Sequence, residues 1–485
     1  MERKNRRDEE KIVLRRFKRM KRKISFLIIA AFLISLLPLY AFALPVQTYQ
    51  TQVYLNGVRI DTGDVPPFIE NGRTMVPLRF FSENLGAAVK WDGNTQTVTV
   101  QGDGVNIKLT VGKKEVFVNG QKKVVDVTPR LVSNRVVVPL RFVAEAFGAQ
   151  VKWNKEESKV VLQWNAKITD STGAEVSIPA GLTRLVVLNT DAAESLRLLQ
   201  IPDEFIVGVS DTVKSDPYLG FDYKESVGSW QNPNFERIMS VKPQAVITYG
   251  KWPDKTLEEK LEPVGIKVIR VDLYKPESYD RDLKTLAKIF GRVKLAEEFI
   301  QWKENKLALL KERVKDIKPE ERVKVFGIWS SSLTSGTWKT FAQGTAVHEG
   351  IELAGGINIA REMKDYPVVS PEWILEKNPS KLVVGTYDKN IIGYLVKDAS
   401  AAEKLREDAI SNPVISQIEA GKNKEVYVIS TKLFGGNKTY LGALYMAKWF
   451  YPERFKDINP DQVLKEYFEK WLGIPLKGVW AYPQP

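Results

Sequence analysis

The chain has 485 residues, of which 44% are hydrophobic, and 72 Lys/Arg against 59 Asp/Glu give a net charge of +13. This length and hydrophobic content are enough for two or three globular domains. Cysteine is absent, which excludes a lipid anchor on cysteine, a disulfide framework, a thiolate metal site and a cysteine nucleophile.

The basic excess is concentrated at the start of the chain. Residues 1–23 hold 12 Lys/Arg and 4 Asp/Glu, so the charge reflects membrane topology and not nucleic-acid binding. An apolar run from Ile24 to Leu37 follows, and Ala41-Phe42-Ala43 fits a small-x-small cleavage site, so we predict a signal peptide over 1–43. An uncleaved signal anchor is the alternative, because Ile24 to Leu44 is long enough to span a membrane. Either way we expect a secreted protein at the outer face of the membrane or the cell wall.

Residues 50–164 contain an internal repeat with a spacing of 62 to 63 residues. The sequence VPLRF occurs at 76–80 and again at 138–142, and VKW occurs at 89–91 and 151–153. Each copy predicts strands, an Asn-Gly turn and a helix of about ten residues. One copy is too small to bury its apolar face, so we expect both to pack into one α+β domain, called the stalk.

The repeat resembles the N-terminal domain family of copper amine oxidases. That name does not imply copper chemistry here, because the sequence contains a single histidine, His348, and such copper sites need several imidazoles. Arg79 and Arg141 could bind carboxylates, but we expect buried structural arginines. The repeat's aromatic residues could form a carbohydrate platform, but we expect them in the core: Phe80, Trp91, Phe142 and Trp153.

Residues 166–485 predict a second, larger domain. Buried strands are expected at 185–188, 205–209, 245–249 and 268–271, each followed by a loop and a helix, which indicates a parallel α/β sheet. Loops at the carboxyl ends of such strands face one cleft. We call residues 166–278 lobe one.

The stretch NPNFERIMSVKPQAVI at 232–247 is similar to a motif of substrate-binding proteins that serve ABC importers for ferric siderophores, haem and cobalamin. The resemblance covers about 166–485 and includes LAGGINIA at 353–360. It implies two parallel-sheet lobes joined by a rigid long helix, a periplasmic-binding-protein-like fold. Residues 279–316 have the matching helical periodicity, in a first segment that ends near Gly291 and a longer second one. Residues 322–485 form lobe two, with strands expected at 323–328, 382–386 and 425–429.

The residues favour binding and not catalysis. His348 lies on a predicted helix, and one histidine cannot assemble a metal site. Ser330, Ser331, Ser332 and Ser335 lack the GxSxG pattern, and no phosphate-binding GxxxxGK[ST] is present. We therefore predict no enzyme, no cofactor and no protein-built metal site.

Aromatic and lysine side chains gather on the predicted cleft loops, which suits a flat, partly apolar chelate such as a siderophore, a corrinoid or haem. Trp230 also matches the segment in which cobalamin-binding members place a tryptophan against the ligand. The candidate ligand-binding residues are Asp191, Trp230, Gln231, Lys251, Trp252, Trp329, Trp338, Tyr366 and Tyr387.

Two glutamates complete the prediction. Glu236 and Glu372 each fall in the first turn of a predicted helix, where a carboxylate is favoured by the helix dipole. In the family that the chain resembles, glutamates at these positions pair with arginines of the permease. We therefore predict an extracellular component of an ABC importer that delivers a metal chelate to a permease with its ATPase. The alternative is a surface protein, structural or sensory, whose stalk binds cell-wall polymer and which has no transport role.

Overall fold

The computed structural model describes residues 51–102 and 104–485. The predicted signal peptide or anchor lies outside these residues. No helix in the described part is long and apolar enough to cross a membrane.

The stalk is built around the repeat. Strand β4 (Arg73–Pro77) of the first copy pairs antiparallel with β11 (Arg135–Pro139) of the second, with Val76 opposite Val138. Each of these strands leads into a short helix, α2 (Leu78–Asn84) or α3 (Leu140–Ala146). The two copies therefore share a central sheet, in the order β10-β11-β4-β3, which confirms the prediction that they pack together.

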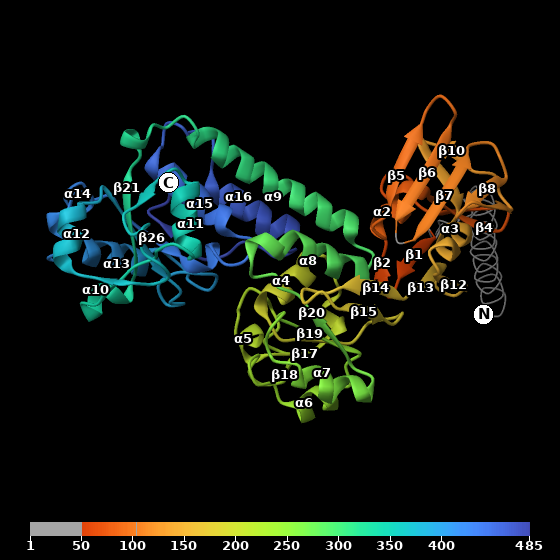
Figure 1. Cartoon of the computed structure of the whole chain (residues 1–485), viewed down its shortest axis with the longest axis horizontal. Helices are drawn as coiled ribbons and strands as arrows, with labels where there is room; N and C mark the ends of the chain where they lie inside the picture. The colour runs from red at the N-terminus through yellow and green to blue at the C-terminus, as the bar shows by residue number, and fades with distance from the viewer. Residues whose placement is uncertain (1–50, 103) are drawn as a thin grey trace, which may run out of the picture. The chain divides into compact units, whose positions relative to one another are not determined.

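Two further sheets complete the stalk (Figure 1). One has the order β12-β13-β1-β2 and the other is the meander β5-β6-β7-β8-β9. The bounds of the remaining stalk strands are β1 Gln52–Leu55, β2 Val58–Arg59, β3 Phe68–Glu70, β5 Ala88–Asp92, β6 Thr97–Gly102, β7 Val105–Thr110, β8 Glu115–Val118, β9 Gln121–Val124, β10 Arg130–Val132, β12 Gln150–Asn154 and β13 Lys159–Gln163.

The stalk shares buried contacts with the larger domain. Asn56 is 1% exposed, its Nδ2 donates to the Trp164 carbonyl at 2.8 Å, and its Oδ1 accepts from the Trp164 and Gly181 N–H groups. A methyl group added at Gly291 would lie 2.4 Å from Leu55 Cδ2. Leu55 thus joins the first strand of the stalk to the loop around Gly291, and Asn56, which follows that strand, is hydrogen-bonded to Gly181 of the larger domain.

Lobe one contains the five-stranded parallel sheet β18-β17-β16-β19-β20. Its three inner strands, β17, β16 and β19, are almost entirely apolar and buried, as expected for a sheet covered on both faces. The hairpin β14 (Ala166–Thr169) and β15 (Glu175–Ile178) precedes it. The other elements are β16 Leu185–Val187, α4 Thr190–Leu198, β17 Ile206–Val209, α5 Asp211–Lys214, β18 Glu225–Ser226, α6 Phe235–Ser240, β19 Ala245–Thr248, α7 Thr256–Leu261 and β20 Lys267–Arg270.

The connecting segment predicted at 279–316 forms two helices, α8 (Pro276–Ile289) and α9 (Val293–Val314), with the break near Gly291 as predicted. Gly291 lies between them with φ +62°, a left-handed conformation that ends the first helix. The 22-residue α9 contacts α2 of the stalk and α15 of lobe two, and Figure 1 shows it as the long green helix between them.

Lobe two contains the sheet β23-β21-β25-β26-β27, parallel except for the edge strand β27. The strands predicted at 323–328, 382–386 and 425–429 are observed within one residue at each end. The elements are β21 Lys324–Trp329, α10 Ser331–Ser335, β22 Trp338–Lys339, α11 Ala346–Leu353, β23 Ile357–Asn358, β24 Val368–Val369, α12 Pro371–Lys377, β25 Lys381–Thr386, α13 Ser400–Ser411, α14 Glu419–Lys422, β26 Val426–Ser430, α15 Thr439–Phe450, α16 Pro460–Glu466 and β27 Ala481–Tyr482.

Candidate functional site

A cavity of about 730 Å³ lies where lobe two meets lobe one. Ser215, Pro217 and Tyr218 of lobe one form one side of it. The opposite side comes from residues at the carboxyl ends of β21, β25 and β26, where ligands bind in parallel α/β sheets. The volume is within the roughly 300–1,000 Å³ range of small-molecule sites.

Three predicted ligand residues line this cavity together: Trp329, Tyr366 and Tyr387. The Trp329 ring lies 5.6 Å from the Tyr387 ring, edge to face, and 6.2 Å from the Tyr366 ring. Tyr387 is 70% exposed and Tyr366 46% exposed, so their faces are open to a ligand. Beneath them Phe341 is fully buried and supports Trp329, with centroids 4.7 Å apart.

The cavity also carries a positive charge. Lys339, Lys389 and Lys432 line it, against the single carboxylate of Asp388. Lys339 Nζ lies 5.5 Å from the centre of the Tyr366 ring. Lys432 pairs with Asp216 of lobe one at 2.8 Å. An anionic group on an aromatic ligand would thus meet lysines at the edge of the aromatic wall.

The predicted Trp338 is not part of this surface. It is 4% exposed and packs against Phe326 in the core of lobe two. Its neighbour Lys339 is exposed and lies at the cavity. The alternation of side chains along a strand explains the difference, because adjacent residues point to opposite faces.

A second aromatic group lies on lobe one. Trp230 packs edge to face on Tyr249 at 4.9 Å, and Tyr249 packs on Tyr274 at 5.5 Å. All three follow the carboxyl ends of parallel strands of the lobe-one sheet: β18, β19 and β20. Gln231, beside Trp230, is exposed. This group does not line the 730 Å³ cavity, so the predicted ligand residues divide between the two lobes.

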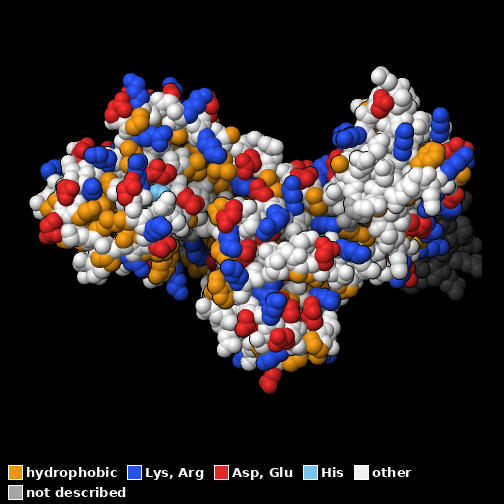
Figure 2. Space-filling model, in the orientation of Figure 1, with side chains coloured by type: hydrophobic (Ala, Val, Ile, Leu, Met, Phe, Trp, Pro, Cys, Tyr) orange, Lys and Arg blue, Asp and Glu red, His pale blue; other side chains and the backbone are white. Residues whose placement is uncertain are grey.

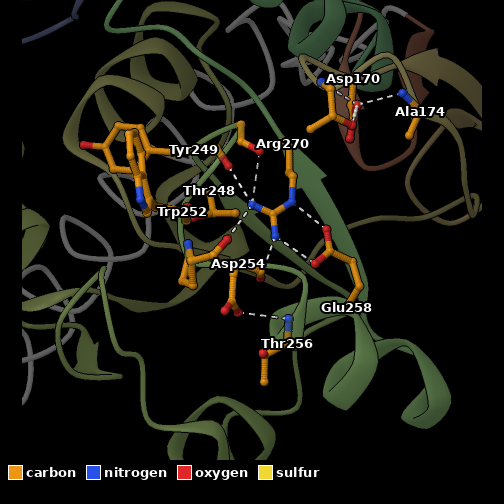
Figure 3. Close-up of polar contacts among 12 residues, drawn as sticks. Asp170, Ala174, Thr248, Tyr249, Trp252, Asp254, Thr256, Glu258 and Arg270 are labelled. Carbon is orange, nitrogen blue, oxygen red and sulfur yellow. Dashed lines mark hydrogen bonds and ion pairs between the residues drawn. The ribbon is translucent and has the colours of Figure 1, made fainter.

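Trp252 and Lys251 lie on a loop that Arg270 holds in place (Figure 3). The Arg270 side chain is buried and donates to the carbonyls of Tyr249, Pro253 and Asp254. It also makes two hydrogen bonds to Glu258, at 2.5 and 2.7 Å. Trp252 itself is 50% exposed. Lys251 lines a separate hollow beside the β14–β15 hairpin. Nothing in the sequence pattern marked Arg270, whose partners are mostly backbone carbonyls.

Asp191 lies at the contact between the lobes. Its Oδ1 is 2.9 Å from the position that a Cβ would take on Gly436, which has φ +58°. Only glycine fits at position 436, so lobe two contacts Asp191 through the backbone of a residue that has no side chain. Burial raises the pKa of the Asp191 carboxyl from its usual 3.8 to about 6, an effect that Lys438 reduces and Glu194 increases.

Next to Asp191 is a buried charge network that sequence reasoning missed. Glu194 accepts hydrogen bonds from Lys438 Nζ at 2.5 Å, from Tyr218 at 2.9 Å and from Tyr467 at 2.5 Å. Burial acts to raise the pKa of Glu194, but Lys438 and the two tyrosine hydroxyls outweigh it, so that pKa lies below its usual value. These contacts join α4 of lobe one to α15 and the turn after α16.

Glu236 and Glu372 both occupy exposed first turns, as predicted. Asn234 caps α6 by accepting from Arg237 N at 3.0 Å, and Ser370 caps α12 by accepting from Trp373 N at 3.2 Å. Hydrogen bonds from its own backbone N–H and from Ser370 lower the pKa of Glu372. His348 is structural: its Nδ1 lies 3.0 Å from Asn358 Nδ2.

A cleft between two α/β lobes, lined by aromatic rings and lysines, defines a solute-binding protein. The family model of the periplasmic binding proteins matches residues 185–433, and the chain belongs to that family. The copper amine oxidase N-terminal domain matches residues 54–162. The chain is therefore an extracytoplasmic solute-binding component of an ABC importer, and not an enzyme.

Proteins that are named for different cargoes are similar to this chain. The chain is 23% identical over 345 residues to the molybdate-binding protein MolA of Haemophilus influenzae, covering 64% of this chain and 92% of that protein. It is 29% identical over 162 residues to the vitamin B12-binding protein of Photorhabdus laumondii, covering 33% and 56%. It is 24% identical over 259 residues to the iron-uptake system-binding protein of Bacillus subtilis, covering 53% and 76%.

Solved structures show the same fold. The TroA-like periplasmic binding protein FepB from Veillonella parvula superposes with a TM-score of 0.56 at 24% identity, covering 65% of this chain and 98% of that one. Molybdate-bound MolA of Haemophilus influenzae gives 0.51 at 21% identity, covering 64% and 99%. The predicted family and fold class are therefore confirmed.

Proposed function

We propose that the protein captures a metal chelate, either a ferric siderophore or a corrinoid, or haem, and delivers it to an ABC permease. The aromatic wall of Trp329, Tyr366 and Tyr387 beside Lys339 supports this proposal most directly. Flat ring systems stack on such side chains, and lysines offset the carboxylate or catecholate charge of a chelate.

A bare oxyanion such as molybdate fits this cavity less well. A small tetrahedral anion needs a few converging donors in a tight pocket, whereas this cavity encloses about 730 Å³ and has three aromatic side chains in its wall. Basic and acidic side chains alternate over the face shown in Figure 2, so this face does not suggest a nucleic-acid partner.

Delivery would use the lobe surfaces that carry Glu236 and Glu372. Both carboxylates are exposed at capped helix starts, where arginines of a permease could reach them. The stalk would hold the binding domain near the cell surface by contacting cell-wall polymer.

The experiment measures the binding of a panel of ligands to the full chain, by tryptophan fluorescence and by ligand absorbance. The panel contains a ferric catecholate, a ferric hydroxamate, cobalamin, haemin and molybdate. We expect one chelate to bind with 1:1 stoichiometry and to quench Trp329, and we expect no binding of molybdate. Binding of molybdate alone would contradict the proposal.

A further inference from the structure

The stalk contains two clefts that the sequence repeat makes equivalent. The first, of about 230 Å³, is lined by Trp91 and Arg79 of the first copy and by Leu131 and Arg135 of the second. The second, of about 300 Å³, is lined by the corresponding residues with the copies exchanged: Trp153, Arg141, Ile69 and Arg73. Each cleft is thus completed by the other half of the repeat.

The two clefts lie at opposite ends of the β4–β11 pair. The first contains Pro77 at the end of β4, and the second contains Arg73 at its start. Four steps of roughly 3.3 Å along this strand put the clefts about 13 Å apart. One linear molecule could therefore occupy both.

Each cleft exposes its tryptophan. Trp91 is 41% exposed and Trp153 is 46% exposed, so the expectation that they belong to the core is wrong. Neither indole N–H meets a hydrogen-bond acceptor among the described residues. The buried positions belong to smaller side chains on the adjacent strands, Val98 opposite Trp91 and Val160 opposite Trp153. At both equivalent positions an exposed indole therefore lines a cleft and offers a face on which a ring can stack.

The polar part of each cleft is cationic. Arg79 and Arg141 are exposed, not buried as expected, and their nearest carboxylates, Glu83 and Glu145, lie 3.6 and 3.9 Å away. The other arginine of each cleft is bound more closely by an acid outside it, Arg135 by Asp64 at 3.1 Å and Arg73 by Asp126 at 2.6 Å. Two arginines and no carboxylate line each cleft, which favours an anion.

We propose that each cleft binds one unit of an acidic polysaccharide, with a sugar ring stacked on the tryptophan and a carboxylate bound by the arginine. A linear chain with carboxylates on separate sugars would then bind both clefts. A polyol phosphate lacks the ring for stacking. A nucleic acid carries a charge on every unit, whereas this domain has only a small basic excess, 15 Lys/Arg against 11 Asp/Glu in residues 51–164. This binding rests on the proposed contact of the stalk with cell-wall polymer, and it is independent of the cargo of the binding domain.

The test uses the full chain and hyaluronan, a linear polysaccharide with a carboxylate on every second sugar. Short oligosaccharides that fill one cleft should bind with a stoichiometry of two by calorimetry, and Trp91→Ala or Trp153→Ala should reduce it to one. Long hyaluronan should lose roughly tenfold or more in affinity with either single variant, because bivalent binding is lost. The double variant should not bind.

Three controls make the outcome decisive. Phe117→Ala removes another exposed aromatic side chain of the stalk, 42% exposed on β8 and outside both clefts, and should leave binding unchanged. Dextran, which is neutral, and polyphosphate, which has no sugar ring, should not bind. The proposal is overturned if hyaluronan does not bind, if binding survives the double variant with a normal unfolding transition, or if polyphosphate competes equally.

Discussion

Lys438 of lobe two donates to Glu194 of lobe one at 2.5 Å, and both side chains are almost completely buried, 11% and 7% exposed. Tyr218 and Tyr467 donate to the same carboxylate, and together with the ion pair they form a buried polar contact between lobe one and lobe two. A bound pair of this kind tolerates little separation, because each charge would then lie in an apolar surrounding. We therefore expect ligand closure to be a rotation of small amplitude.

Lys438→Met should lower the free energy of unfolding by about 3–5 kcal/mol, because it leaves the Glu194 charge buried without its partner. Urea denaturation of the full chain measures this loss. The double variant Glu194→Gln, Lys438→Met should recover most of the stability. Equal losses of unfolding free energy in the single and the double variant would show that side-chain packing, and not charge, determines the stability of the contact between the lobes.

Asp191→Asn should make the protein more stable at neutral pH. The folded-state pKa of Asp191, about 6, lies above the usual 3.8. Between these two values the Asp191 carboxyl keeps its proton in the folded protein and has lost it in the unfolded chain. The contribution of this carboxyl is therefore most favourable below pH 4 and is lost as the pH rises through 6. At about 1.4 kcal/mol per pKa unit, the gain above pH 6 has an upper limit of roughly 3 kcal/mol.

Thermal melts of both proteins between pH 4 and pH 8 test the Asp191 prediction. The two melting curves should coincide near pH 4 and separate as the pH rises. Asp388, an exposed carboxylate of the cavity, provides the matched control, and Asp388→Asn should show no such divergence. A constant difference for Asp191→Asn at all pH values would contradict the assigned ionisation.

Trp329→Ala should weaken chelate binding by about 1–3 kcal/mol if its ring stacks on the ligand. Trp230→Ala tests the second aromatic group, on lobe one, in the same way, and should leave the melting temperature of the empty protein nearly unchanged. Trp338→Phe, in the core of lobe two, is the matched control and should affect stability but not affinity. Unaltered affinity in both alanine variants would remove the aromatic groups from the site.

A chain that starts at Ala166 should bind its ligand with the affinity of the full chain, because no stalk residue lines the 730 Å³ cavity. It should be less stable by more than about 1 kcal/mol, because Leu55 and Asn56 no longer cover the segment around Gly291. Calorimetry and denaturation of both chains measure the two effects. A loss of affinity with the fold intact would mean that the stalk contributes to the site.

The fold was accessible from the sequence because its signals are local. Buried parallel strands such as β25 appear as continuous apolar runs, and the helix caps at Asn189, Asn234 and Ser370 are specified by the residue itself. The repeat predicted the stalk for the same reason. The end of the first connecting helix near Gly291 was predicted as well, and glycine in a left-handed conformation ends α8 there.

The site was less accessible because it depends on long-range packing. Tyr218 and Lys432 line the cavity from positions more than 200 residues apart, and no local pattern joins them. Trp338 and Trp153 illustrate the converse difficulty: both follow strand-like patterns, yet one is buried and the other exposed. Which face of a strand meets the core is decided by the neighbouring layer.

The central claim is delivery of a ligand to a permease, and the double variant Glu236→Ala, Glu372→Ala tests it most directly. Loss of the first-turn charges should cost only about 0.3–1 kcal/mol of stability at each helix. The matched control, Glu204→Ala, Glu320→Ala, removes two exposed carboxylates elsewhere. Uptake of the chelate by cells, and stimulation of the transporter's ATPase, should fail with the first variant and persist with the control, while ligand affinity stays normal in both. Normal uptake with the Glu236→Ala, Glu372→Ala protein would contradict the docking role and favour a surface protein without transport function.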